Sequence, residues 1–204
     1  MAAADVGRER DPSDGGLLPE VEGPLLVTAA ATYVDRRAIV DTPHVGAGTR
    51  IWEFVHVLRG ARIGRNCNIN SHVFVENDVV IGDGVTVKCG VYLWDGIRLE
   101  DRVFVGPNVT FTNDPLPRSR RPVEPAITTV REGASLGGAA VIGPGVTIGR
   151  WAMVGMGSVV TKDVPDHVLV YGNPLRQAGW VCFCGARTAS RPRTCRHRRS
   201  RSAT

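Results

Sequence analysis

One histidine and one column of polar side chains carry the acid–base chemistry that the sequence offers. Histidine often takes a proton from an amine or hydroxyl nucleophile near neutral pH, so His56, in the segment IWEFVHV, is the first candidate for a general base. Asn77, Asp95 and Asn113 recur at intervals of eighteen residues, and an Asn113/Asp95 pair could orient a nucleophile and help to remove its proton. A structural alternative stays open for both: a histidine that only packs, and an asparagine ladder that stabilises turns.

Aromatic and charged side chains stand close to these candidates in the sequence and could bind a substrate. Tyr92 and Trp94 lie just before Asp95, in the segment VYLWDG. Asp114 and Arg118 belong to the segment NDPLPRSRRP. Because a guanidinium pairs with anionic oxygens through parallel hydrogen bonds, arginines here suit a ligand such as a nucleotide diphosphate. The alternative is an exposed loop that binds nothing.

A six-residue period must position these residues. Large apolar anchors occur at every sixth position from Val45 to Phe111, and again from Val130 to Val160. A small or β-branched residue usually follows four positions later, and Gly often follows directly. We expect these glycines to supply turn conformations that a Cβ would disfavour.

Neither an amphipathic helix, with its spacing of three and four, nor a two-sided strand, with its spacing of two, fits this pattern. The sequence therefore predicts an all-β fold, a parallel β-helix with three hexads per coil. Residues eighteen apart would then stack at one strand spacing. In that arrangement His56 stacks with Phe74 and Tyr92, and the polar column runs beside them.

The period breaks once, between Phe111 and Val130, where its phase shifts by one residue. A regular coil cannot hold two X-Pro turns followed by three arginines, so we expect residues 113–127 to leave the coil as an inserted loop. A loop on a rigid scaffold is a favoured place for a substrate site. The predicted organisation is a disordered leader (1–27), a β-helix domain (28–180) and a short C-terminal extension (181–204), an Arg-rich tail that we also expect to be disordered.

Composition excludes several classes of protein. The 204-residue chain has a formal net charge of +5, but seven arginines lie beyond Gly185, so about −2 remains for the rest. We therefore expect no nucleic-acid partner. No apolar run approaches the roughly 18 residues of a membrane span, and the N-terminus lacks the pattern of a secretory signal. A soluble, cytoplasmic protein without a membrane partner is the expectation.

The cysteines near the C-terminus raise the question of a metal. Cys182, Cys184, Cys195 and His197 form a C-x-C…C-x-H pattern that could in principle hold Zn²⁺. The spacing is not that of a standard zinc ribbon, and the surrounding tail is rich in arginine. The sequence therefore favours thiols or the remnant of a motif, and we expect no metal.

The repeat and the closing segment together resemble the bacterial hexapeptide-repeat acetyltransferases, which fold as left-handed parallel β-helices. The segment TKDVP…GNPLR matches the closing motif of that family. The resemblance implies acetyl-CoA as co-substrate, bound between neighbouring prisms of a homotrimer near the C-terminal coils. It implies four residues at the coenzyme, with the two cations on its phosphates: Lys162, Asn173, Pro174 and Arg176.

Within this family the stretch KCGVYLWDGIRLEDRVFVGPNVTFTNDPLPRS is similar to N-acetyltransferases of nucleotide-linked 3-amino sugars, above all those of the dTDP-3-amino-3,6-dideoxyhexose type. Enzymes acting on UDP-linked 3-amino uronic acids share the segment IW…FVHV, so the choice of nucleotide stays open. The resemblance implies attack of a sugar amine on the thioester carbonyl through a tetrahedral oxyanion.

The sequence leaves an alternative within the family and disfavours two functions of other kinds. An O-acetyltransferase acting on a sugar or antibiotic hydroxyl would need a definite base, because a hydroxyl has a far higher pKa than an amine. A non-catalytic β-helix scaffold would not explain the arginine loop or the closing cations. A γ-type carbonic anhydrase needs three histidines around Zn²⁺, two of them close in sequence, and the five histidines here show no such pair.

Overall fold

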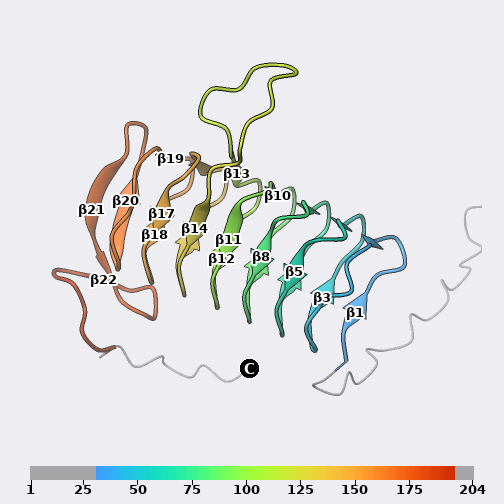
Figure 1. Cartoon of the computed structure of the whole chain (residues 1–204). Helices are drawn as coiled ribbons and strands as arrows, with labels where there is room; N and C mark the ends of the chain where they lie inside the picture. Colours follow the sequence, from blue (N-terminus) through green and yellow to red (C-terminus); the bar gives the residue numbers. More distant parts are fainter. Residues whose placement is uncertain (1–30, 196–204) are drawn as a thin grey trace, which may run out of the picture.

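The computed structural model describes residues 31–195, and the leader predicted over residues 1–27 lies outside them. Short strands wind into stacked coils that form one elongated prism (Figure 1). The strands of the coils fall on three faces. The first face holds β1 (Tyr33–Val34), β3 (Arg50–Ile51), β6 (Asn68–Ile69), β9 (Thr86–Val87), β12 (Phe104–Val105), β15 (Ser135–Leu136), β18 (Met153–Val154) and β20 (Val168–Tyr171).

The second face holds β2 (Ile39–Val40), β4 (His56–Val57), β7 (Phe74–Val75), β10 (Tyr92–Leu93), β13 (Thr110–Phe111), β16 (Val141–Ile142) and β19 (Val159–Val160). The third holds β5 (Arg62–Ile63), β8 (Val80–Ile81), β11 (Ile97–Leu99), β14 (Thr128–Val130) and β17 (Thr147–Ile148). Neighbouring coil strands pair in parallel, so the predicted parallel β-helix is confirmed.

The register follows the predicted repeat. Ile51 pairs with Ile69 and Val87 with Val105, each eighteen residues apart. Across the interruption the separation becomes 31, as in the pair of Val105 with Leu136. The thirteen extra residues are two hexads plus one, which accounts for the shift in phase. They leave the prism between β13 and β14 as the predicted loop (Figure 1).

The core of the prism is a continuous stack of the anchor residues and their small partners. Every anchor from Ile51 to Val160 is buried, while Val45, on the first complete coil, is partly exposed. The corner residues four positions later, such as Val55, Ala61 and Cys67, are buried beside them. Burial of branched side chains along the whole length provides the main driving force for this fold.

The glycines that directly follow the anchors serve a purpose different from the one predicted. Those at positions such as Gly64 and Gly106 do not adopt positive φ. A Cβ at Gly106 would lie 2.7 Å from backbone atoms of the next coil, so these positions need Gly for close stacking. Positive φ instead occurs three residues after an anchor, at Phe54, Asn66 and Asn108 among others.

The C-terminal extension is more ordered than the sequence predicts. β20 turns back as the antiparallel strand β21 (Arg176–Val181), which pairs with β22 (Arg187–Thr188). Residues 181–188 thus extend the sheet of the first face instead of belonging to a disordered tail, because the pairing of β22 with β21 and the packing of Phe183 against the last coils hold them. Among residues 31–195 we find no helix with the length and apolar character needed to cross a membrane.

Candidate active site

A row of aromatic side chains crosses the second face of the prism. His56, Phe74 and Tyr92 stand in register on β4, β7 and β10, which confirms their predicted stacking. The ring of His56 meets Phe74 edge-on, with 5.6 Å between centroids. Trp94 completes the group at 5.9 Å from both Phe74 and Tyr92. These side chains line a shallow groove of about 380 Å³, together with Phe54, His72 and Val73.

His56 can take part in proton transfer from this groove. Its side chain is 39% exposed, and Nε2 lies 3.7 Å from Oδ2 of Asp41. The imidazole is thus open to solvent and close to a carboxylate, and contacts of this length often shorten only when substrate is bound.

The polar column also stacks as predicted, but its side chains bond to the main chain. Oδ1 of Asn77 accepts the backbone N–H of Gly60 at 3.1 Å. Oδ1 of Asp95 accepts the N–H of Asp78 at 2.6 Å. Nδ2 of Asn113 donates to the carbonyl oxygen of Asp95 at 3.1 Å. This is the geometry of the ladder that the sequence left open as an alternative.

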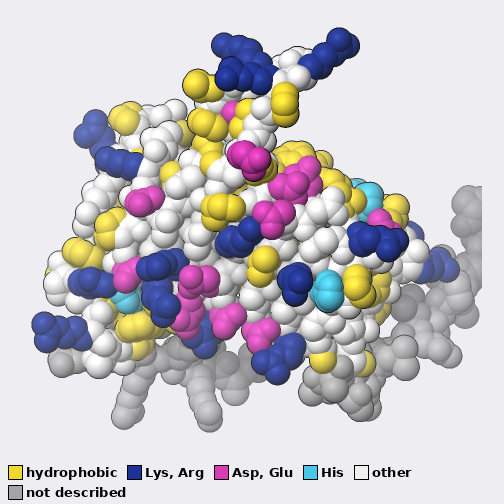
Figure 2. Space-filling model, in the orientation of Figure 1, with side chains coloured by type: hydrophobic (Ala, Val, Ile, Leu, Met, Phe, Trp, Pro, Cys, Tyr) yellow, Lys and Arg dark blue, Asp and Glu magenta, His cyan; other side chains and the backbone are white. Residues whose placement is uncertain are grey.

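Asn113 also closes the base of the inserted loop, because its carbonyl oxygen accepts the N–H of Ala126 at 2.9 Å. Asp114 begins the loop, and its Oδ1 accepts the N–H of Leu116 at 2.8 Å. Arg118 is exposed, and its Nη1 donates a local hydrogen bond to the carbonyl of Pro117. Figure 2 shows basic side chains gathered on the protruding loop, where Arg118, Arg120 and Arg121 are exposed.

A second groove, of about 300 Å³, lies at the end of the last coil. Lys162, from the turn after β19, and Arg176, at the start of β21, line it. Leu175 and Gln177 complete its β21 side, and Val168 and Val170 form its apolar wall. Asp163 and Pro165 also line it, so the groove holds two cations, one carboxylate and an apolar wall.

The other two residues predicted at the coenzyme, Asn173 and Pro174, lie in the exposed turn between β20 and β21 and do not line this groove. The two grooves are separated along the prism by the strands β13 and β16. Three strand spacings from β10 to β19 correspond to roughly 14 Å. The predicted residues therefore form two groups on one chain.

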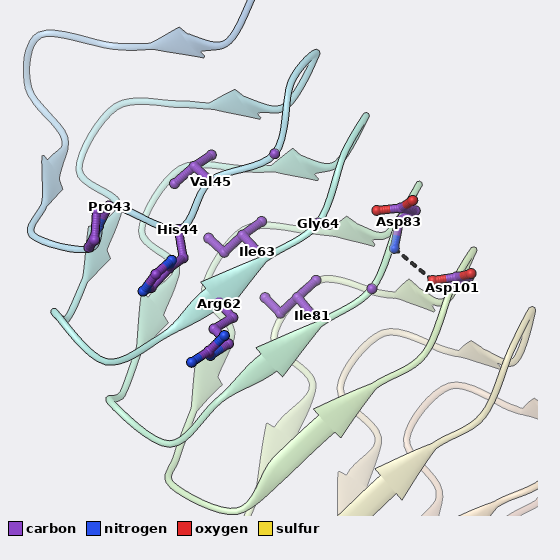
Figure 3. Close-up of a pocket in the computed structure, with 11 residues that line it drawn as sticks. Pro43, His44, Val45, Arg62, Ile63, Gly64, Ile81, Asp83 and Asp101 are labelled. Carbon is purple, nitrogen blue, oxygen red and sulfur yellow. Dashed lines mark hydrogen bonds between the residues drawn. The ribbon is translucent and has the colours of Figure 1, made fainter.

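A wider groove, of about 510 Å³, lies along the first coils and contains none of the predicted site residues (Figure 3). Its two carboxylates already have partners: Oδ1 of Asp101 accepts the N–H of Asp83 at 2.8 Å. The carboxylate of Asp83 in turn accepts the N–H of Arg65 and pairs with its guanidinium, which lowers the pKa of Asp83. We therefore assign this groove no chemistry.

Sequence reasoning missed Asp41 and Phe54. Asp41 follows β2, which pairs with β4 at a separation of seventeen, as Ile39 with His56. A spacing of eighteen residues, which holds in the later coils, does not predict that Asp41 lies beside His56. Phe54 occupies a turn at φ 59° and stacks on His72, eighteen residues later, with 5.1 Å between ring centroids. The aromatic pair at that spacing was the signal that could have found it.

Two family models match the repeats: "Bacterial transferase hexapeptide (six repeats)" over residues 42–77 and "Hexapeptide repeat of succinyl-transferase" over residues 128–162. The dTDP-3-amino-3,6-dideoxy-alpha-D-galactopyranose 3-N-acetyltransferase of Aneurinibacillus thermoaerophilus is 56% identical over 153 residues, which are 74% of this chain and 80% of that relative. The galactoside O-acetyltransferase of Lactococcus lactis is 31% identical over 56% of this chain and 60% of its own length.

Among solved structures, a hexapeptide-repeat acetyltransferase of Vibrio cholerae in complex with acetyl coenzyme A matches with a TM-score of 0.52 and 30% identity. The match covers 59% of this chain and 70% of that one. The family models lie on coils of the prism, at residues 42–77 and 128–162, and the 56% identical relative matches over 80% of its own length. The chain therefore belongs to the hexapeptide-repeat acetyltransferases.

Proposed function

We propose that the protein transfers an acetyl group from acetyl-CoA to the amine of a nucleotide-linked 3-amino-3,6-dideoxy sugar, with dTDP as the nucleotide. The observation that carries this proposal is the 56% identity to a dTDP-amino-sugar 3-N-acetyltransferase over most of both chains. The aromatic groove and the terminal groove supply the two surfaces that such a reaction needs.

In this reaction the amine nitrogen attacks the thioester carbonyl, forming a tetrahedral oxyanion. The oxyanion collapses, the C–S bond breaks, and coenzyme A leaves as its thiol while the nitrogen gives up a proton. We assign that proton to His56, which lines the aromatic groove with its Nε2 3.7 Å from Oδ2 of Asp41, and which then gives a proton to the departing thiolate. A sugar amine is partly unprotonated near neutral pH, so His56 assists a nucleophile that is already competent.

The nucleotide sugar is proposed to bind across the aromatic groove and under the inserted loop. Tyr92 and Trp94 offer ring faces for a base or sugar, and stacking of this kind contributes about 1–3 kcal/mol per base. Arg118 is proposed to pair with the diphosphate, and Asp114 is proposed to hold the start of the loop that carries it, through its hydrogen bond to Leu116. Asn77, Asp95 and Asn113 act as positioning residues, because their side chains hold the turns beneath this surface.

Acetyl-CoA is proposed to occupy the terminal groove, with its phosphates on Lys162 and Arg176 and its acetyl arm directed toward β10. Asn173 and Pro174 precede Leu175 and Arg176, which line the groove, and are proposed to contact the coenzyme from the turn between β20 and β21. A homotrimer is part of the proposal, since a neighbouring prism could cover both grooves and bring the two ligands together. The cytoplasm, where acetyl-CoA and nucleotide sugars occur together, is the proposed location.

The test is to incubate the purified chain with acetyl-CoA and dTDP-3-amino-3,6-dideoxyhexose, and to measure the acetylated nucleotide sugar by mass spectrometry. Rapid formation of a product heavier by one acetyl group supports the proposal. The UDP-linked 3-amino sugar is the matched control for the nucleotide. No product from either amine would refute the proposed acceptor.

A hydroxyl acceptor is the second candidate, favoured by the similarity to a galactoside O-acetyltransferase and by the His56–Asp41 pair. Attack by a hydroxyl needs a base in the transition state far more than attack by an amine does. Turnover of galactosides that is abolished in His56→Ala, with no turnover of amines, would favour this alternative.

A further inference from the structure

Three thiols converge in the C-terminal extension, away from both grooves. The sulfur atoms of Cys182, Cys184 and Cys195 all lie within 4.8 Å of one another. Thiolates around a tetrahedral Zn²⁺, at about 2.3 Å from the ion, are roughly 3.8 Å apart. The three cysteines therefore need only small adjustments to share one ion.

A tight turn holds the first two cysteines in place. The N–H of Cys182 donates to the carbonyl of Ala186 at 2.8 Å, and the N–H of Gly185 donates to the carbonyl of Cys182 at 2.8 Å. Gly185 sits at φ +86°, a conformation that a side chain would disfavour.

The turn is docked on the last coils of the prism. Phe183, between the two cysteines, packs edge-on against His167 and Trp151, with centroid distances of 4.6 and 5.3 Å. The N–H of Val181 donates to the carbonyl of His167 at 2.8 Å, and Nδ1 of His167 lies 3.1 Å from the carbonyl of Val181. The first two thiols are thus fixed before any ligand arrives.

The third thiol returns to this turn from eleven residues further along. β22 reverses the chain beside β21, and Arg191 pairs with Asp166 at 3.0 Å on the way. The return leaves Cys182 buried, Cys184 partly buried and Cys195 exposed. A buried ligand on a docked turn with an exposed closing ligand is a suitable arrangement for a structural metal.

We propose that Cys182, Cys184 and Cys195 bind a structural Zn²⁺ that fastens the C-terminal hairpin to the prism. This assignment reverses the expectation drawn from spacing alone, because the structure brings together three sulfurs that the sequence separates. Zn²⁺ fits better than a disulfide, which would join only two of them. A fourth ligand completes a closed site; His197, two residues after Cys195, lies outside the described residues.

The experiment measures bound metal in the full-length chain, purified without chelators or affinity metals and dialysed extensively. Elemental analysis is expected to find about one zinc per chain in the wild type. Cys184→Ser and Cys195→Ser should each retain roughly tenfold less. The matched control is Cys89→Ser, which removes an exposed thiol from the coils and should keep the wild-type zinc content.

A second measurement does not depend on the variants folding. Exchange of the wild-type chain into Co²⁺ should give the visible absorption of a tetrahedral thiolate site, and added zinc should abolish it. Absence of zinc from wild-type protein expressed with zinc, or retention of full zinc by both serine variants, would overturn the proposal. A metal-free native chain lighter by two hydrogens, with two thiols lost, would overturn it in favour of a disulfide.

Discussion

The aromatic row and the polar column run over the same coils, yet they use the eighteen-residue repeat in opposite ways. In the row of His56, Phe74 and Tyr92, the side chains face outward and line a groove. In the column of Asn77, Asp95 and Asn113, each side chain returns to the main chain of the preceding coil. The side chains of the row remain available to a ligand, whereas the polar atoms of the column already bond to the main chain of the prism.

This difference shows that stacking alone does not identify a site on a β-helix. Both columns have the spacing that placed them among the candidates, but only one exposes its reactive atoms. The two columns differ in whether their polar atoms already have hydrogen-bond partners in the protein. Such a hydrogen bond must be broken before the atom can bind a substrate. Variants of the two columns should therefore separate loss of rate from loss of stability.

The largest effect is expected from His56→Ala. Removal of the proton acceptor should lower kcat by about 10²-fold, the lower range for general bases, because the amine is partly deprotonated without help. The thermal midpoint should change little, since the side chain is 39% exposed. Steady-state kinetics with acetyl-CoA and the amino sugar measure the change in kcat.

The matched control is His44→Ala, which removes another exposed histidine of the coils and should keep full activity. An unchanged kcat in His56→Ala would remove His56 from the mechanism.

Tyr92→Ala should have the next largest effect. Loss of one stacking surface, worth about 1–3 kcal/mol, should raise KM for the nucleotide sugar by about tenfold and leave KM for acetyl-CoA unchanged. Tyr92 is 51% exposed, so stability should be nearly preserved. Phe104→Ala removes a similarly exposed ring from the first face and serves as the control. Equal KM values in the two variants would show that the aromatic groove does not bind this substrate.

The sequence predicted the prism well because one strong periodicity sets both burial and register. It predicted the meeting of His56, Phe74 and Tyr92 for the same reason. It could not find Asp41, because the first coil pairs at seventeen. The sequence also could not show whether Asp95 and Asn113 form a structural ladder or a substrate site. The answer depends on the hydrogen bonds of their side chains, which the repeat does not specify.

Long-range order at the C-terminus escaped prediction for a different reason. Composition alone made residues 181–195 resemble a disordered tail, but the antiparallel pairing of β22 with β21 and the contact of Phe183 with His167 order the first part of this segment. These contacts involve single residues and no repeat. Periodic sequence thus predicts periodic structure, whereas a unique contact must be observed.

Asn113→Ala tests the polar column and should act mainly on stability. Loss of the Nδ2 hydrogen bond to the carbonyl of Asp95 should lower the free energy of unfolding by about 1 kcal/mol, measured by urea denaturation. Asn77→Ala is the matched variant of the ladder. It loses the hydrogen bond to the N–H of Gly60 and should lower the free energy of unfolding by a similar amount. A hundredfold fall in kcat with unchanged stability, in Asn113→Ala alone, would instead make Asn113 a catalytic residue.

The smallest effect is expected at Asp83, a ladder residue outside both columns, and it should appear as a dependence on pH. The N–H and guanidinium of Arg65 lower the pKa of Asp83 in the folded protein. A carboxylate with a lowered folded pKa stabilises the fold fully above its unfolded pKa, about 3.9, and loses that contribution as the pH falls through the lower folded value. The thermal midpoint of the wild type should therefore exceed that of Asp83→Ala at pH 7, and the difference should close below about pH 4. Salt should have a related effect. Because the Arg65–Asp83 ion pair is exposed, added salt should narrow the difference in thermal midpoint between wild type and Asp83→Ala at pH 7. A difference that stays constant from pH 7 to pH 2 would show that the charge of Asp83 contributes nothing to the ladder.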